Sequence, residues 1–154
     1  MSDEPITSSQ KKILVIDDNE IILKTVFIKL QKAGFQVFTA INASRGVELA
    51  RKEIPDMILL DIGFPLGTVG NRVVDGFTGV LWDGFRIMDW LHNVEETKNI
   101  PIVIISGMDD DKNKQRAQAG GVLAFFPKPL NFDEMLKVVR SALAVQPENT
   151  VPAV

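Results

Sequence analysis

The 154-residue chain contains no cysteine and no tyrosine, and it has a single histidine. The absence of cysteine excludes a disulfide framework, a thiolate metal site and a cysteine nucleophile. Long apolar runs are also missing, because runs such as 102–105 are far too short to span a bilayer. Residues 1–10 lack the basic start and apolar core of a signal peptide. We therefore expect a soluble, cytoplasmic protein that does not contact a membrane.

The composition is that of an ordinary globular domain. Charged residues make up 24% and hydrophobic residues 45% of the chain, values that exclude wholesale disorder. Seventeen basic and 20 acidic side chains give a net charge of −3, which argues against broad nucleic-acid binding. The length suits one domain. We expect this domain to cover residues 13–145, between an N-terminal tail at 1–12 and a C-terminal tail at 146–154.

Five short apolar runs alternate with segments of helical periodicity. The runs are mostly continuous, which is typical of strands covered on both faces. Five successive strand–helix units indicate a parallel sheet between two layers of helices. We therefore predict an α/β fold, a three-layer (βα)5 sandwich that is doubly wound with the flavodoxin-like strand order 2-1-3-4-5. The predicted strands are 13–16, 37–38, 57–60, 102–105 and 123–126, and the predicted helices are 21–30, 43–52, 85–92, 109–119 and one that begins after Asn131.

Polar residues follow four of the predicted strands. Asp17 and Asp18 follow the first strand, and Asp61 follows the third. Ser106 follows the fourth strand, and Lys128 comes shortly after the fifth. In an open parallel sheet, ligands bind beyond the carboxyl ends of the strands. We therefore expect these side chains to converge on one pocket.

These residue types together suit phosphoryl chemistry. Three carboxylates in one pocket repel each other, so one must be protonated or a cation must neutralise them. An all-oxygen donor set suits Mg²⁺. A lysine and a hydroxyl could bind phosphoryl oxygens, and an aspartate can attack phosphorus to give an acyl phosphate. Taken singly, each residue has a plainer interpretation, because aspartates after strands often cap helices and a Lys-Pro pair is usual in loops.

The connection after the third strand is unusually long. Residues 66–82 contain several glycines together with valines, a phenylalanine and a tryptophan. Strand-to-helix connections usually have roughly two to six residues. We therefore expect an insertion at about 66–80. Because exposed apolar clusters tend to mark contacts, we expect it to form a lid over the site or a surface for a partner.

Five segments together carry a family resemblance. They are Ile13 to Asn19 with the acidic pair, Leu59 to Pro65 around Asp61, Asp83-Gly84-Phe85, Ile100 to Gly107 and Ala124 to Leu130. In combination they resemble the receiver domain of two-component response regulators, in its stand-alone form. The resemblance covers roughly residues 12–145. It departs from the family pattern at the insertion before Asp83.

The resemblance implies a role for each acidic residue. Asp61 would be the phosphoacceptor. Asp17, Asp18 and Asp61 would bind Mg²⁺ through their carboxylates, and the backbone carbonyl of Gly63 would be a further metal ligand.

The resemblance also implies how the phosphoryl group would be bound and sensed. Lys128 would bind the phosphoryl group, and its peptide bond to Pro129 would be cis. Ser106 would move toward a phosphoryl oxygen, and Phe125 would turn inward in concert. Phe125 carries no hydroxyl at a position where a tyrosine would offer one.

The resemblance therefore implies a phosphorylated switch and not a turnover enzyme. A histidine kinase or phosphotransfer protein would supply the phosphoryl group. The signal would reach an unknown downstream protein through the face of the fourth helix, fifth strand and fifth helix, or through residues 66–82. We expect no DNA-binding domain in this chain. The alternative is a degenerate receiver that binds proteins without being phosphorylated.

Overall fold

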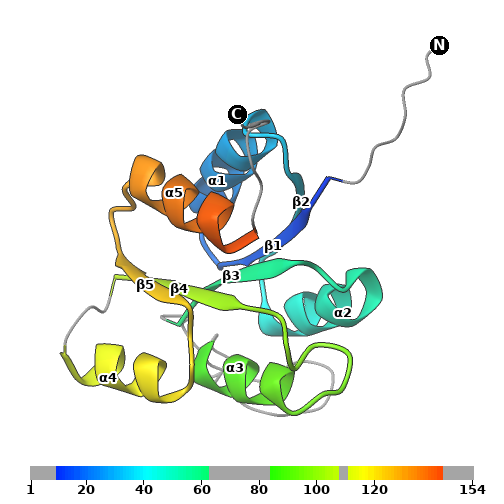
Figure 1. Ribbon diagram of the computed structural model, residues 1–154, viewed down its shortest axis with the longest axis vertical. Coiled ribbons are helices and arrows are strands. Elements are labelled where there is room, and N and C mark those ends of the chain that lie inside the picture. Colours follow the sequence, from blue (N-terminus) through cyan, green and yellow to red (C-terminus); the bar gives the residue numbers. More distant parts are fainter. Residues whose placement is uncertain (1–9, 63–83, 108–110, 144–154) are drawn as a thin grey trace, which may run out of the picture.

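The computed structural model describes residues 10–62, 84–107 and 111–143 (Figure 1). Its centre is a five-stranded parallel sheet with the order β2-β1-β3-β4-β5, so the predicted order is confirmed. The strands are β1 (Lys12–Ile16), β2 (Gln36–Ala40), β3 (Met57–Asp61), β4 (Ile102–Ser106) and β5 (Ala124–Pro127).

Helices cover both faces of the sheet, which confirms the three-layer prediction. Figure 1 shows α1 and α5 on one face, and α2, α3 and α4 on the other. Among the described residues, no helix is long and apolar enough to cross a membrane. The helices are α1 (Glu20–Lys32), α2 (Ala43–Glu53), α3 (Gly84–His92), α4 (Asp111–Ala119) and α5 (Phe132–Leu143).

Two apolar cores explain why the strands read as continuous apolar runs. In β1, Leu14 packs with the helices α2, α3 and α4, while Val15 packs with α1 and α5. The same alternation holds in β3, where Ile58 and Leu59 enter opposite cores. Every residue of β3 and β4 is buried, because helices shield both of their faces.

Asparagine caps place the helix starts close to the carboxyl edge of the sheet. The Asn19 side chain accepts hydrogen bonds from the first backbone N–H groups of α1, at Ile21 and Ile22. The predicted cap of α5 is also present, since Asn131 Oδ1 accepts from the Glu134 N–H at 3.1 Å. The stop predicted for the first helix at Gly34 is confirmed, because this glycine has a φ of 101° just after α1.

The largest boundary difference is in β2, which is longer than the predicted 37–38. It pairs with all of β1, from Lys12 opposite Gln36 to Ile16 opposite Ala40, so its length follows that of its partner. Only 37–38 was predicted because Gln36 and Thr39 interrupt the apolar pattern of this edge strand. The predicted insertion at 66–80 and C-terminal tail at 146–154 lie outside the described residues.

Candidate functional site

Three aspartates meet at the carboxyl edge of the sheet. Asp17 directly follows β1 and Asp61 ends β3, and these two strands are hydrogen-bonded neighbours. One carboxylate oxygen from each of Asp17, Asp18 and Asp61 lies within 4.8 Å of the others. Asp17 and Asp61 are only 2% and 4% exposed, whereas Asp18 faces solvent. The convergence expected from the strand ends is therefore present in the fold.

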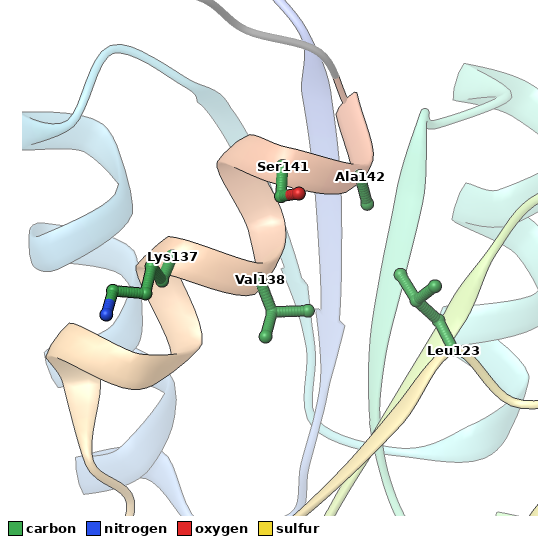
Figure 2. A pocket seen from close by; sticks show the side chains of 5 residues that line it. All are labelled: Leu123, Lys137, Val138, Ser141 and Ala142. Carbon is green, nitrogen blue, oxygen red and sulfur yellow. The ribbon is translucent and has the colours of Figure 1, made fainter.

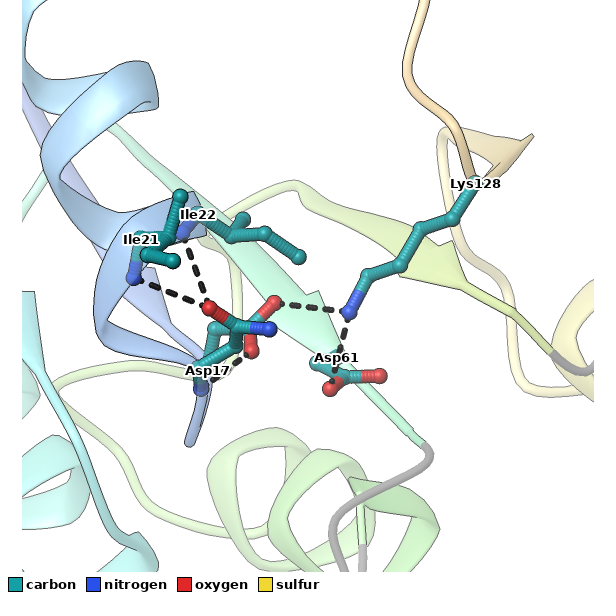
Figure 3. A network of polar contacts seen from close by, with 6 residues as sticks. Asp17, Ile21, Ile22, Asp61 and Lys128 are labelled. Atoms are coloured by element: carbon teal, nitrogen blue, oxygen red, sulfur yellow. Dashed lines mark hydrogen bonds and ion pairs between the residues drawn. The ribbon is translucent and has the colours of Figure 1, made fainter.

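Lys128 reaches this cluster from the other side of β4. Its Nζ lies 3.0 Å from Asp17 Oδ2 and 3.2 Å from Asp61 Oδ2 (Figure 3). Its backbone N–H donates to the carbonyl of Ser106 at 2.9 Å, which fixes the start of the side chain beside the end of β4. The Lys128–Pro129 peptide bond is cis, the geometry that the resemblance implies.

Asp17 is held at both of its carboxylate oxygens. Oδ2 contacts Lys128, and Oδ1 accepts a hydrogen bond from the Asn19 N–H at 2.8 Å. Asn19 also caps α1, so one residue orients the carboxylate and starts the helix. Asn19 belongs to the first segment that carries the family resemblance, but neither role was predicted for it. The available signal was its position just before a helix, where asparagine is a favoured cap.

The electrostatics of the cluster leave an excess of negative charge. Partial desolvation beside the two buried aspartates, followed by repulsion from Asp17, raises the pKa of Asp18 above its ordinary value. Burial alone would lower the pKa of Lys128, but its hydrogen bond to Asp17 and the charge of Asp61 outweigh that effect and raise it. Lys128 is therefore an ammonium at neutral pH. One cation faces three carboxyl groups, and such a set fits a hard divalent cation such as Mg²⁺.

Two further predicted residues lie on the neighbouring strands. Ser106 ends β4 and is fully buried, and it stands one position beyond Ile105, the register partner of Asp61. Phe125 is on β5, opposite Ile104 of β4. It is partly buried against the core that faces α2, α3 and α4. The predicted metal ligand Gly63 lies outside the described residues.

The fold, and the three aspartates at the carboxyl edge of its sheet, indicate a class of protein. Comparison of the sequence with known families indicates the same class. Residues 13–140 match the model of the response regulator receiver domain, and the chain belongs to that family. It is 31% identical over 133 residues to the protein PilH of Pseudomonas aeruginosa, covering 86% of this chain and 98% of PilH. It is 23% identical to the polar-differentiation response regulator DivK of Brucella anthropi, covering 86% and 96% of the two chains.

Solved structures of other proteins share this fold. The chemotaxis protein CheY4 of Vibrio cholerae superposes with a TM-score of 0.73 at 25% identity, covering 87% of this chain and 99% of CheY4. A CheY-like receiver domain protein of Methanospirillum hungatei gives a TM-score of 0.73 at 23% identity, covering 88% and 95%. Membership of the family supports a phosphoacceptor function in two-component signalling. It does not favour the alternative of a phosphorylation-independent binding module.

Proposed function

We propose that this receiver domain accepts a phosphoryl group on Asp61 in a reaction that depends on Mg²⁺. The observation that carries the proposal is the position of Lys128 Nζ, 3.2 Å from the Asp61 carboxylate and 3.0 Å from that of Asp17. The residue that would be the nucleophile, the cation that would bind phosphoryl oxygens and the carboxylates that would bind the metal share one edge of the sheet. Their proximity supports all three roles that the resemblance implied.

The reaction would transfer a phosphoryl group from an imidazole nitrogen of the donor to a carboxylate oxygen of Asp61. The donor would be a phosphohistidine of a histidine kinase or phosphotransfer protein. An Asp61 carboxylate oxygen attacks phosphorus, a P–O bond forms and the P–N bond breaks. The electron pair of the broken bond stays on the imidazole nitrogen, and the product on Asp61 is an acyl phosphate. Lys128 binds a non-bridging oxygen of the transferring group, whose charge must be stabilised throughout.

The carboxylates would hold the cation in a partly fixed arrangement. Asp17, Asp18 and Asp61 would be the metal ligands, with the Gly63 carbonyl that the resemblance implies. Bound Mg²⁺ would supply charge neutralisation at the phosphoryl oxygens. Asp17 is already oriented by Asn19 and Lys128, whereas Asp18 is exposed and can adjust to an incoming group.

The output would follow from the new charge beside Lys128. We propose that Ser106 responds through its hydroxyl and that Phe125 changes its packing, so that the face of α4, β5 and α5 presents a different surface to a downstream protein. The backbone hydrogen bond from Lys128 to Ser106 joins the two strand ends involved. In this role the protein is a switch and not a turnover enzyme. A contribution from residues 66–82 and a cytoplasmic location stay predictions.

Intact mass after incubation with acetyl phosphate and Mg²⁺ tests this proposal. We expect one added phosphoryl group on the wild-type chain and none on Asp61→Asn. Asp89→Asn is the matched control, because Asp89 is exposed on α3 and takes no part in the acidic cluster. Label that persists in Asp61→Asn, or a folded wild type that stays unmodified, would contradict the proposal.

A further inference from the structure

An open apolar groove lies between the start of β5 and the last turns of α5. Its volume is about 330 Å³, and its lining residues are Leu123, Lys137, Val138, Ser141 and Ala142 (Figure 2). Leu123 is 45% exposed, so a large aliphatic side chain faces solvent at this groove. The groove is separate from the acidic edge, because Leu123 precedes β5 whereas Lys128 follows it.

The lining indicates what the groove would bind. In Figure 2, Val138 and Ala142 lie on the side of α5 toward Leu123, and the Lys137 ammonium points away from Leu123. The interior is therefore aliphatic and carries one positive charge at its rim. A short apolar segment with an acidic residue would match it, because apolar side chains gain most from leaving water and the carboxylate would meet the lysine.

The sequence after α5 is a segment of this kind. Residues 144–154 follow Leu143 and therefore start two positions beyond the lining residue Ala142. Valine, proline and alanine dominate 151–154, and Glu148 is the single charged side chain of 144–154, opposite in sign to Lys137. A short tether gives an effective concentration on the order of millimolar, so a weak contact is enough to fill the groove. A free partner would need much tighter binding to a surface this small.

We propose that residues 145–154 of this chain dock in the groove. Val151 and its apolar neighbours would cover Leu123 and Val138, and Glu148 would lie near Lys137. The segment would then shield part of the surface shared by β5 and α5. This inference is independent of the chemistry at Asp61.

A nitroxide label in the full-length chain tests the proposal. Because the chain has no cysteine, Ala153→Cys gives a single labelling site. In NMR spectra we expect the label to broaden the methyl signals of Leu123 and Val138 in preference to those of Ile41, which precedes α2. A second substitution, Val151→Asp, should reduce this broadening about threefold, because a buried carboxylate is costly.

Thr150→Asp is the matched control, since it adds the same charge at the adjacent position and should keep the broadening. Equal broadening in Val151→Asp and Thr150→Asp would overturn the proposal. A mixed sample of spin-labelled chains and separate isotope-labelled chains distinguishes a second copy as the occupant. Broadening of Leu123 in that sample would also overturn docking within one chain.

Discussion

The ammonium of Lys128 lies 3.2 Å from the Asp61 carboxylate, although 67 positions of the sequence separate the two residues. The same nitrogen lies 3.0 Å from Asp17. Both aspartates are almost completely buried, while the lysine side chain is 21% exposed. One cation at the edge of the core is therefore shared by two carboxylates inside it.

Removing this cation is expected to destabilise the fold. We predict that Lys128→Gln lowers the free energy of unfolding by roughly 2 kcal/mol, less than for a fully buried pair because water screens part of the interaction. Mg²⁺ should restore part of the loss, since a cation that binds the folded state stabilises it. Urea denaturation with and without Mg²⁺ measures both effects. Lys114→Gln, at an exposed position of α4, should change stability by less than about 0.5 kcal/mol. Equal losses in the two variants would contradict the prediction.

The raised pKa of Asp18 predicts that its ionisation costs stability when no divalent cation is present. Since the pKa is higher in the folded state, the folded chain holds this proton more tightly, and stability falls as pH rises through the ordinary pKa of an aspartate. Asp18→Asn should therefore stabilise the cation-free protein at pH 7, by on the order of 0.5 kcal/mol. The gain should vanish in acid, where Asp18 is neutral in both states.

Thermal melts in a chelator, followed by melts in Mg²⁺, measure this prediction. In Mg²⁺ the wild type should be more stable than Asp18→Asn, because it gains binding energy from the cation that the variant has lost. A less stable Asn variant at neutral pH without cation would show that burial and repulsion do not dominate at Asp18.

The close approach of α2 to β1 makes Gly46 sensitive to substitution. A Cβ at this position would lie 2.7 Å from Ile16 Cδ1. Overpacking of this kind costs about 1–3 kcal/mol, which exceeds the gain of about 1 kcal/mol from alanine in a helix. We predict that Gly46→Ala destabilises the protein and that adding Ile16→Val, which removes Cδ1, costs less than the two single changes summed.

Chemical denaturation of the four chains of this cycle gives the coupling energy, expected at about 1 kcal/mol. Gly107→Ala is a suitable control, because a Cβ there would meet no atom within 4 Å. Strict additivity would mean that α2 moves away from the sheet at no cost.

The backbone strain at Ile54 can be measured by comparing glycine substitutions at Ile54 and at a second exposed isoleucine, Ile41. Ile54 is the C-cap that follows α2, and its φ of 45° is a left-handed conformation that is unfavourable for a β-branched residue. Ile41 is similarly exposed, at 40% against 43%, and its backbone is not left-handed. We expect Ile41→Gly to cost about 1–2 kcal/mol more than Ile54→Gly, because glycine relieves strain only at position 54. Melting temperatures that fall equally in the two variants would contradict this.

The sequence predicted the sheet and the acidic cluster because both depend on pattern and topology. Runs such as 57–60 are continuous because both faces of the strand are covered, and parallel strands place their following residues at one edge. Local geometry was not predictable in the same way. The left-handed Ile54, the close approach of Gly46 and the double role of Asn19 all depend on how the layers meet. The roles assigned to Ser106 and Phe125 stay predictions, because the fold gives their positions without their motions.

Asp61 ends the middle strand of the sheet, with β1 bonded on one side and β4 on the other. Leu60 pairs with Ile16 of β1 and Ile104 of β4, and Asp61 pairs with Ile105, so the backbone amides at this end of β3 should be among the slowest of the chain to exchange with deuterium. A covalent change at this carboxylate would therefore act at a rigid end of β3, which the neighbouring strands hold in place. The resulting displacement would have to travel outward, into the connections beyond the strand ends, where the molecule can meet another protein.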